Sequence, residues 1–212
     1  SSHTRAIAAT EAGRFADEIL PVPYVDADGA PALHTCDEGI RPPDRAKMAG
    51  LPPLIPPDGL INAAMASQIC DGASAVLIAN ERAVAAHGLT PLARSHTMAV
   101  CGSDPTIVLE GPIPATRLVL ERAGLTIDDI ALYEVNEAFG TVPLAWAKAI
   151  GADLDRLNVN GGAQALGHPL GATGTKLVAT LVHELHRRGE RYGLIAICEG
   201  LGTANATIIE AL

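Results

Sequence analysis

The chain has 212 residues, of which 48% are apolar and 3% aromatic, and its formal net charge at neutral pH is −9. A chain of this length can bury a sizeable core without metal ions or disulfide bonds. Because aromatic residues are so few, that core must consist mainly of Ala, Val, Leu and Ile, which suits helices packed closely on a sheet. The acidic balance, without clustered cations, argues against nucleic acid as a partner.

The four cysteines, Cys36, Cys70, Cys101 and Cys198, lie far apart and form neither a CxxC pair nor a dense secreted-type framework. This usage favours a reducing, cytoplasmic environment. No apolar run is long enough to span a membrane, and the sequence shows no signal-peptide pattern. The chain begins with Ser1 rather than Met, which leaves room for residues upstream.

The first third of the chain combines one predicted helix with a proline-rich stretch. Residues 4–18 have helical spacing of Ala6, Ala9 and Phe15. Residues 21–59 contain three Pro-Pro pairs, which forbid long regular structure and stiffen the backbone. This stretch is either a covering loop or a simple linker.

From residue 70 onward, short apolar runs alternate with helical patterns. The helix at 176–188 is the clearest, with an apolar stripe, a cationic last turn and Gly189 as its end. The other predicted helices are 81–87, 115–123 and 142–150, and the predicted strands are 74–79, 94–100, 130–135, 157–159, 192–198 and 206–210. Strands alternating with helices and a closing strand pair predict an α/β sheet with one antiparallel neighbour.

The stretch from Asn158 to Thr175, NVNGGAQALGHPLGATGT, holds five glycines and His168 between a predicted strand and a helix. Glycine at this density lets backbone approach a ligand closely, although a plain glycine-rich turn is the alternative. The order Gly174-Thr175-Lys176 is not that of a phosphate-binding Walker loop. Gly200 to Asn205 lacks the third small residue of a dinucleotide fingerprint, and His183 and His186 lack zinc-protease spacing, so no metal site is predicted.

Three loops at predicted strand ends carry polar groups suited to acyl transfer. Asn136 follows one strand, His168 lies in the glycine loop, and Cys198 ends another strand. In α/β sheets ligands gather at such ends, where an amide, an imidazole and a thiol could stabilise an oxyanion and move protons. Taken singly, each has an ordinary structural alternative: a helix cap, a satisfied loop histidine and an inert buried thiol.

The chain resembles the C-terminal half of a thiolase, an acyl-CoA acetyltransferase. The resemblance covers essentially the whole chain and rests on NEAF at 136–139, the glycine stretch at 158–174 and CEG at 198–200, with further matches at 37–42, 66–77 and 110–115. It implies a thiolase-like fold with layered helices on a mixed sheet. It also implies three parts: residues 1–69 from the loop region that covers coenzyme A, residues 70–90 as the last strand and helix of the N-terminal domain, and residues 91–212 as the C-terminal domain.

The resemblance implies a role for each matching residue. His168 would activate the nucleophilic cysteine and donate to the thioester oxygen, and Asn136 would hold the water that completes this oxyanion hole. Cys198 would act as the acid and base at the carbon nucleophile or incoming thiol, and Gly200 would offer its N–H to a second oxyanion hole. Ser67 would contact the pantetheine arm of coenzyme A.

Three positions depart from the family pattern. The nucleophilic cysteine in its N-x-x-C-x-S setting is absent, because Cys70 lies in QICDGAS and Cys101 in AVCGSDP. A longer polypeptide or a separate subunit would then complete the site. Leu201 stands where a glycine is usual, and Ala64-Met65 replaces Gly-Asn, so the acyl pocket is expected to differ.

These features lead to the hypothesis of a cytoplasmic thiolase-type enzyme of lipid metabolism and β-oxidation. It would cleave a 3-oxoacyl-CoA by thiolysis or run the reverse condensation, with coenzyme A as substrate and no permanently bound cofactor. A homo-oligomer is expected, with acyl-CoA and an N-terminal thiolase half as partners. The alternatives are a non-catalytic thiolase-like subunit for acyl-CoA binding or assembly, and a condensing enzyme of the ketoacyl-synthase type.

Overall fold

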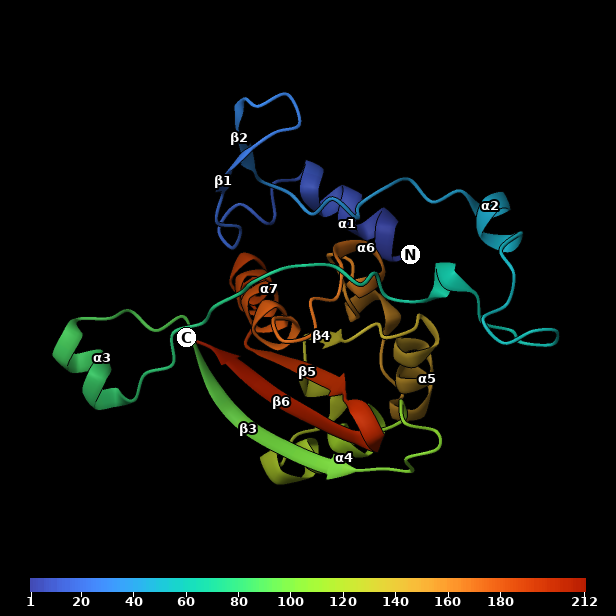
Figure 1. The fold of residues 1–212 in the computed structure, drawn as a ribbon. Coiled ribbons are helices and arrows are strands. Elements are labelled where there is room, and N and C mark those ends of the chain that lie inside the picture. Colours follow the sequence, from blue (N-terminus) through green and yellow to red (C-terminus); the bar gives the residue numbers. More distant parts are fainter.

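The computed structural model describes residues 1–212, and its centre is a four-stranded mixed sheet in the order β3-β6-β5-β4 (Figure 1). The strands are β3 (Ala93–Gly102), β4 (Leu132–Val135), β5 (Tyr192–Cys198) and β6 (Thr203–Ala211). β4 and β5 are parallel, while β6 runs antiparallel to both β5 and β3. The predicted α/β sheet with an antiparallel neighbour is therefore confirmed.

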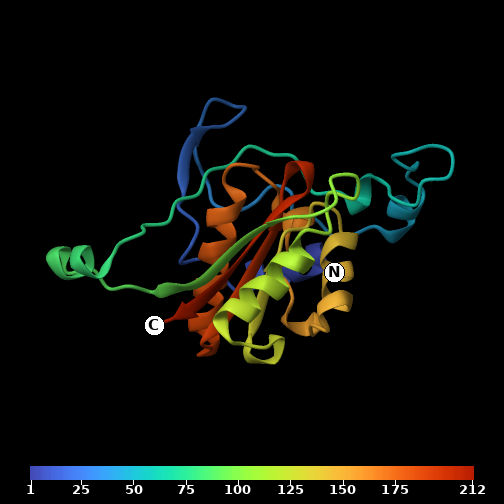
Figure 2. The same cartoon turned by 90° about the horizontal axis from the view of Figure 1, so that it is seen from below.

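Helices cover the two faces of this sheet (Figures 1 and 2). On one face, α4 (Pro112–Ala123) and α5 (Thr141–Ile150) enclose a core that includes Trp146 and Tyr133. On the other face, α7 (Thr173–Arg188) packs its leucine stripe on Leu132, Ile195 and Ile209. Alternating residues of each strand thus enter separate cores, as the period of a strand requires.

The first 60 residues lie outside this sheet. α1 (Ser2–Glu11) packs Ala6 and Ala9 on the short helix α6 (Ala163–Leu166). The predicted helix at 4–18 is thus too long, since the chain after Glu11 forms turns and Gly13 takes a φ of +67°. Residues 21–59 contain only the hairpin of β1 (Val22–Val25) and β2 (Pro31–His34) and the short helix α2 (Arg45–Ala49), in line with the proline content.

Two predicted strands are not formed. Residues 74–79 are irregular, with 81% of Leu77 and 88% of Ile78 exposed, because no strand of this chain lies beside them to accept their backbone hydrogen bonds. Residues 157–159 contribute a single bridge from Leu157 to Tyr133. The helix α3 (Glu81–His87), ended by Gly88, is confirmed and stands away from the body (Figure 1).

Short 3-10 turns connect several elements, at Ala63–Met65, Ile127–Asp129, Leu154–Arg156 and Gly200–Gly202. Each lies at a boundary between a loop and a longer element. No helix in the structure combines the length and apolar character needed to cross a bilayer.

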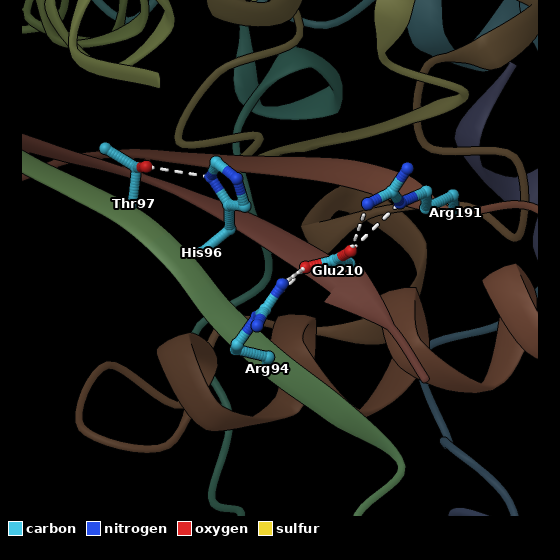
Figure 3. A network of polar contacts seen from close by, with 5 residues as sticks. All are labelled: Arg94, His96, Thr97, Arg191 and Glu210. Atoms are coloured by element: carbon cyan, nitrogen blue, oxygen red, sulfur yellow. Dashed lines mark hydrogen bonds and ion pairs between the residues drawn. The ribbon is translucent and has the colours of Figure 1, made fainter. Parts of the chain in front are cut away.

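The buried carboxylate of Glu210 joins β3, β5 and β6 at the end of the sheet opposite Cys198 (Figure 3). Glu210 on β6 is only 4% exposed and pairs with Arg94 of β3 and with Arg191, whose Nη2 lies 2.7 Å from Oε1. The guanidinium of Arg191 also lies over the ring of Tyr192, 4.7 Å from its centroid. The two arginines hold the pKa of Glu210 below its ordinary value.

We expect Glu210→Gln to lower the urea midpoint of unfolding at pH 7. Because the carboxyl pKa is lowered in the folded chain, its stabilisation is present above the ordinary glutamate pKa and is lost as pH falls through the folded value. The difference between wild type and variant should therefore shrink on acidification. Glu121→Gln, at an exposed carboxylate, is the control; an equal loss in both variants would contradict a specific role for Glu210.

Candidate active site

Asn136 and Cys198 lie at the carboxyl ends of two adjacent parallel strands. In the β4–β5 register, Val135 faces Ala196, and the N–H of Asn136 donates to the carbonyl of Ala196 at 3.0 Å. Cys198 follows two residues later at the end of β5. The sequence-based expectation that these two residues share one edge of the sheet therefore agrees with the structure.

His168 is brought to the same edge by α7. This helix immediately precedes β5 and packs on it, so its chain returns antiparallel and its first turn lies beside the carboxyl end of β5. A Cβ placed on Gly174 would lie 3.9 Å from Cδ1 of Ile197, the residue before Cys198. His168 precedes α7 by five residues, so the three polar loops gather at one end of the sheet.

The imidazole of His168 is held through one nitrogen and leaves the other available. Its Nδ1 lies 2.7 Å from Oγ1 of Thr173, and that hydroxyl donates to the carbonyl of Pro169 at 3.2 Å. The single hydroxyl hydrogen is then used, which assigns the imidazole proton to Nδ1 and the free lone pair to Nε2. Partial burial lowers the pKa of His168, so the neutral ring is favoured at neutral pH.

The thiol of Cys198 is 8% exposed, and its surroundings favour the protonated form. Burial raises the thiol pKa, and the neighbouring Glu199 carboxylate raises it further. Glu199 itself accepts a hydrogen bond from Nδ2 of Asn205. Cys198 is therefore suited to deliver a proton rather than to act as a resting nucleophile.

The side-chain amide of Asn136 is an exception among the buried polar groups. The residue is 2% exposed, and neither Oδ1 nor Nδ2 has a hydrogen-bond partner within the protein. An unsatisfied buried amide costs about 1 to 3 kcal/mol, which a bound water or substrate oxygen would offset. The edge of the sheet that carries Cys198 thus also carries an amide that lacks a partner.

The remaining predicted residues lie on loops beside these groups. Gly200 is exposed at the start of the turn that follows β5. Leu201 next to it has a φ of +60°, a left-handed conformation that glycine adopts more readily than leucine. The N–H of Ser67 donates to the carbonyl of Ala138 at 3.1 Å, which places Ser67 beside the loop that begins with Asn136.

Glu137 braces the glycine loop and was not among the predicted site residues. Its carboxylate accepts the N–H of Gln164 at 3.0 Å and lies 3.4 Å from Nδ2 of Asn158. A Cβ on Gly162 would approach this carboxyl group to 2.4 Å, so the loop backbone lies directly against it. The sequence signal for Glu137 was its position directly after Asn136. Its contact with the glycine loop is visible only in the tertiary structure.

An open cavity of about 350 Å³ lies between residues 70–74 and residues 169–172, which follow His168 in the sequence. Its walls mix the thiol of Cys70, the hydroxyl of Ser74 and the apolar Leu170. No group of three or more His, Cys, Asp or Glu side chains is arranged to bind a metal ion. The site chemistry described here is that of an imidazole, a thiol and an amide.

We expect iodoacetamide to modify Cys198 more slowly than the exposed Cys36 and Cys70 at pH 7.5, because burial limits access and raises the thiol pKa. Peptide mass spectrometry of the native chain over time provides the measurement. In urea all these cysteines should react at similar rates. Preferential native modification of Cys198 would contradict the proton-holding environment described above.

Comparisons with known proteins place the chain among thiolases. The family model for the thiolase C-terminal domain matches residues 89–211, and that for the N-terminal domain matches residues 1–82. The steroid 3-ketoacyl-CoA thiolase FadA6 of Mycobacterium tuberculosis is 56% identical over 212 residues, which are 100% of this chain and 51% of that protein. A 3-ketoacyl-CoA thiolase of Yersinia enterocolitica is 47% identical over 216 residues, covering 99% of this chain and 55% of the relative.

Solved structures agree with this relationship. The human mitochondrial 3-ketoacyl-CoA thiolase matches with a TM-score of 0.95 and 44% identity, covering 100% of this chain and 53% of that one. The same human enzyme in complex with CoA matches with a TM-score of 0.93 and 43% identity, covering 100% and 52%. The chain thus spans about half the length of these relatives. By sequence and by fold, the chain belongs to the thiolase family.

Proposed function

We propose that this chain supplies part of a thiolase active site, which cleaves a 3-oxoacyl-CoA by thiolysis or forms it by the reverse condensation. The observation that carries the proposal is the unpartnered, buried amide of Asn136 at the same sheet end as His168 and Cys198. The names of the relatives, which are 3-ketoacyl-CoA thiolases, support the same reaction class. Membership of the thiolase family sets the ketoacyl-synthase alternative aside.

In the first half-reaction, Nε2 of His168 takes the proton of a nucleophilic thiol supplied by the N-terminal thiolase half. The thiolate attacks the 3-oxo carbonyl, and the bond between the α and β carbons breaks. The acyl group stays on the nucleophile, and the released carbanion of the CoA thioester takes the proton of Cys198. The raised pKa of Cys198 suits this step, because the thiol keeps its proton until the carbanion forms.

In the second half-reaction, the Cys198 thiolate removes the proton of an incoming coenzyme A thiol. That sulfur attacks the acyl group, and the nucleophile leaves and recovers its proton from His168. Developing negative charge on the thioester oxygen is stabilised by His168 and by a water bound to Asn136, while the N–H of Gly200 serves a second oxyanion hole. The free enzyme groups return to their starting protonation states.

Coenzyme A enters this scheme as a substrate, with no permanently bound cofactor. Ser67 is proposed to contact its pantetheine arm, supported by its place beside the Asn136 loop. The CoA complex of the related human enzyme supports a CoA site in this fold.

The proposed domain division places residues 1–69 in the loop region, 70–90 in the N-terminal domain and 91–212 in the C-terminal domain. The match of residues 1–82 to the N-terminal family model supports the first two assignments in part. The nucleophile then comes from an N-terminal thiolase half, in the same polypeptide or as a separate subunit. We further propose a homo-oligomer acting in the cytoplasm, in β-oxidation and related lipid metabolism.

A second candidate is a thiolase-like subunit that binds acyl-CoA or assembles with another chain without turnover. The names of the relatives, which are 3-ketoacyl-CoA thiolases, do not favour this candidate. The experiments below separate the two, because only the enzyme loses turnover when His168 is changed. Acyl-CoA binding without turnover, once the N-terminal half is supplied, would establish the second candidate.

With an N-terminal thiolase half supplied, His168→Ala should lower kcat/KM for thiolysis by roughly 10²- to 10⁴-fold, the usual contribution of a general base. Loss of the enolate absorbance of the 3-oxoacyl-CoA in the presence of coenzyme A measures the reaction. His34→Ala, on the exposed hairpin, is the matched control and should keep wild-type activity. Full thiolysis by His168→Ala would refute the assignment.

Cys198→Ala should abolish thiolysis while acyl transfer from acetyl-CoA to the nucleophile continues. The reason is that the coenzyme A thiolate is a weak enough base to leave without the Cys198 proton, so this transfer is only slowed, whereas the carbanion formed when the carbon-carbon bond breaks requires that proton. Intact-mass detection of an acetylated N-terminal half measures the surviving step. Retention of thiolysis in this variant would show that another group delivers the proton.

A further inference from the structure

Gln68 is joined through its backbone to both ends of the turn that presents His168. Its N–H donates to the carbonyl of Ala163 at 3.3 Å, and its own carbonyl accepts the N–H of His168 at 2.8 Å. Ala163 begins α6, and His168 follows two residues after this helix ends. The backbone of Gln68, almost 100 positions earlier in the chain, therefore forms hydrogen bonds to both ends of the turn, as the backbone of a neighbouring strand would.

The side chain of Gln68 supplies hydrogen bonds to the C-terminal end of the same helix, which is buried. Its Nε2 lies 2.6 Å from the carbonyl of Gln164 and 3.3 Å from that of Ala165. These carbonyls belong to the last turn of α6, where a helix provides no donors of its own. The amide of Gln68 thus caps the helix that immediately precedes His168.

The amide group is itself fixed from the opposite side. Its Nε2 also lies 3.2 Å from the carbonyl of Gly39, and its Oε1 accepts from Nη1 of Arg41 at 2.8 Å. A Cβ on Gly39 would lie 2.6 Å from Nε2 and 2.7 Å from the Ala165 carbonyl, so the space around the amide is filled. Every polar atom of the Gln68 side chain therefore has a partner, and the group cannot turn without losing one.

We propose that Gln68 is the positioning residue for His168, acting through the last turn of α6 and the backbone bond to the His168 N–H. The inference rests on the proposed function, in which His168 is the general base. Gln68 touches none of the reacting atoms in that scheme.

Removal of the Gln68 amide leaves two carbonyls at the end of α6 without a donor. We expect the turn then to relax so that water reaches the imidazole. Because partial burial lowers the pKa of His168, added water should raise it toward the ordinary histidine value. Displacement of a catalytic group by about 1 Å is enough to lower turnover by roughly 10²-fold.

The test uses Gln68→Met, which keeps the length of the side chain and removes its donors. The imidazole pKa of His168 is measured in the 212-residue chain by NMR titration, with the His168 signal assigned from its absence in His168→Ala. We expect the pKa to rise relative to wild type. Asn62→Ala is the matched control, because Asn62 also uses its amide within the loop region but contacts Met48 and Ala64 instead of α6.

An unchanged His168 pKa in a folded Gln68→Met chain would overturn the proposal, as would an equal rise in Asn62→Ala. If Gln68→Met does not fold, Gln68→Asn decides by the same titration, because it keeps an amide that is one methylene too short to reach α6. A His168 pKa that stays at the wild-type value in folded Gln68→Asn also counts against the proposal.

Kinetics with a supplied N-terminal half provide the second readout. Gln68→Met should lower kcat roughly tenfold or more, while KM for the acyl-CoA stays within about twofold, since positioning acts on the chemical step. A rise in KM at constant kcat would assign Gln68 to substrate binding and overturn the positioning role. The titration needs no turnover, so it tests the positioning role independently of the proposed function. If His168→Ala is fully active while Gln68→Met still raises the His168 pKa, the proposed function fails but the positioning of His168 by Gln68 stands.

Discussion

The parallel pairing of β4 with β5 is the contact on which the rest of the site depends. Because carboxyl ends of parallel strands meet at one edge, this pairing places Asn136 and Cys198 at the same edge of the sheet. The return of α7 along β5 then brings the glycine loop and His168 to the same edge. A slip of one residue in the β4–β5 register would turn alternate side chains to the opposite face and separate these groups.

Burial acts in opposite directions on the two titrating groups of the site. It lowers the pKa of His168 and raises that of Cys198, because a low dielectric disfavours the charged form of either group. The result is a neutral imidazole with a free Nε2 and a protonated thiol. A base and an acid can therefore coexist at neutral pH without forming an ion pair that would consume both.

The N-terminal part of the chain contacts the glycine loop. The hydroxyl of Ser2 accepts the N–H of Gly162 at 2.9 Å and lies 3.2 Å from the Gly162 carbonyl. Gly161, with a φ of +90°, has no room for a Cβ, which would lie 2.8 Å from Cβ of Ala6. Together with Gln68, α1 holds the glycine loop from outside the sheet, while Glu137 holds it from within.

Local sequence signals determined most of the elements and the identity of the candidate groups. The apolar stripe and glycine end of α7, the closing strand pair and the helix α3 follow from periodicity and helix-ending glycine, which act over a few residues. The polar residues at strand ends were likewise visible, because strand ends are marked by changes of composition. The family motifs added the order in which Asn136, His168 and Cys198 occur.

Only the tertiary structure decided which distant residues hold these groups and which apolar runs become strands. Residues 74–79 read as a buried strand, yet a strand requires a neighbour for its backbone groups, and none of this chain's strands lies beside them. The contacts of Gln68 and Glu137 with the glycine loop were equally hidden. Hydrogen bonds between residues far apart in sequence depend on how the elements pack, and no local pattern records that packing.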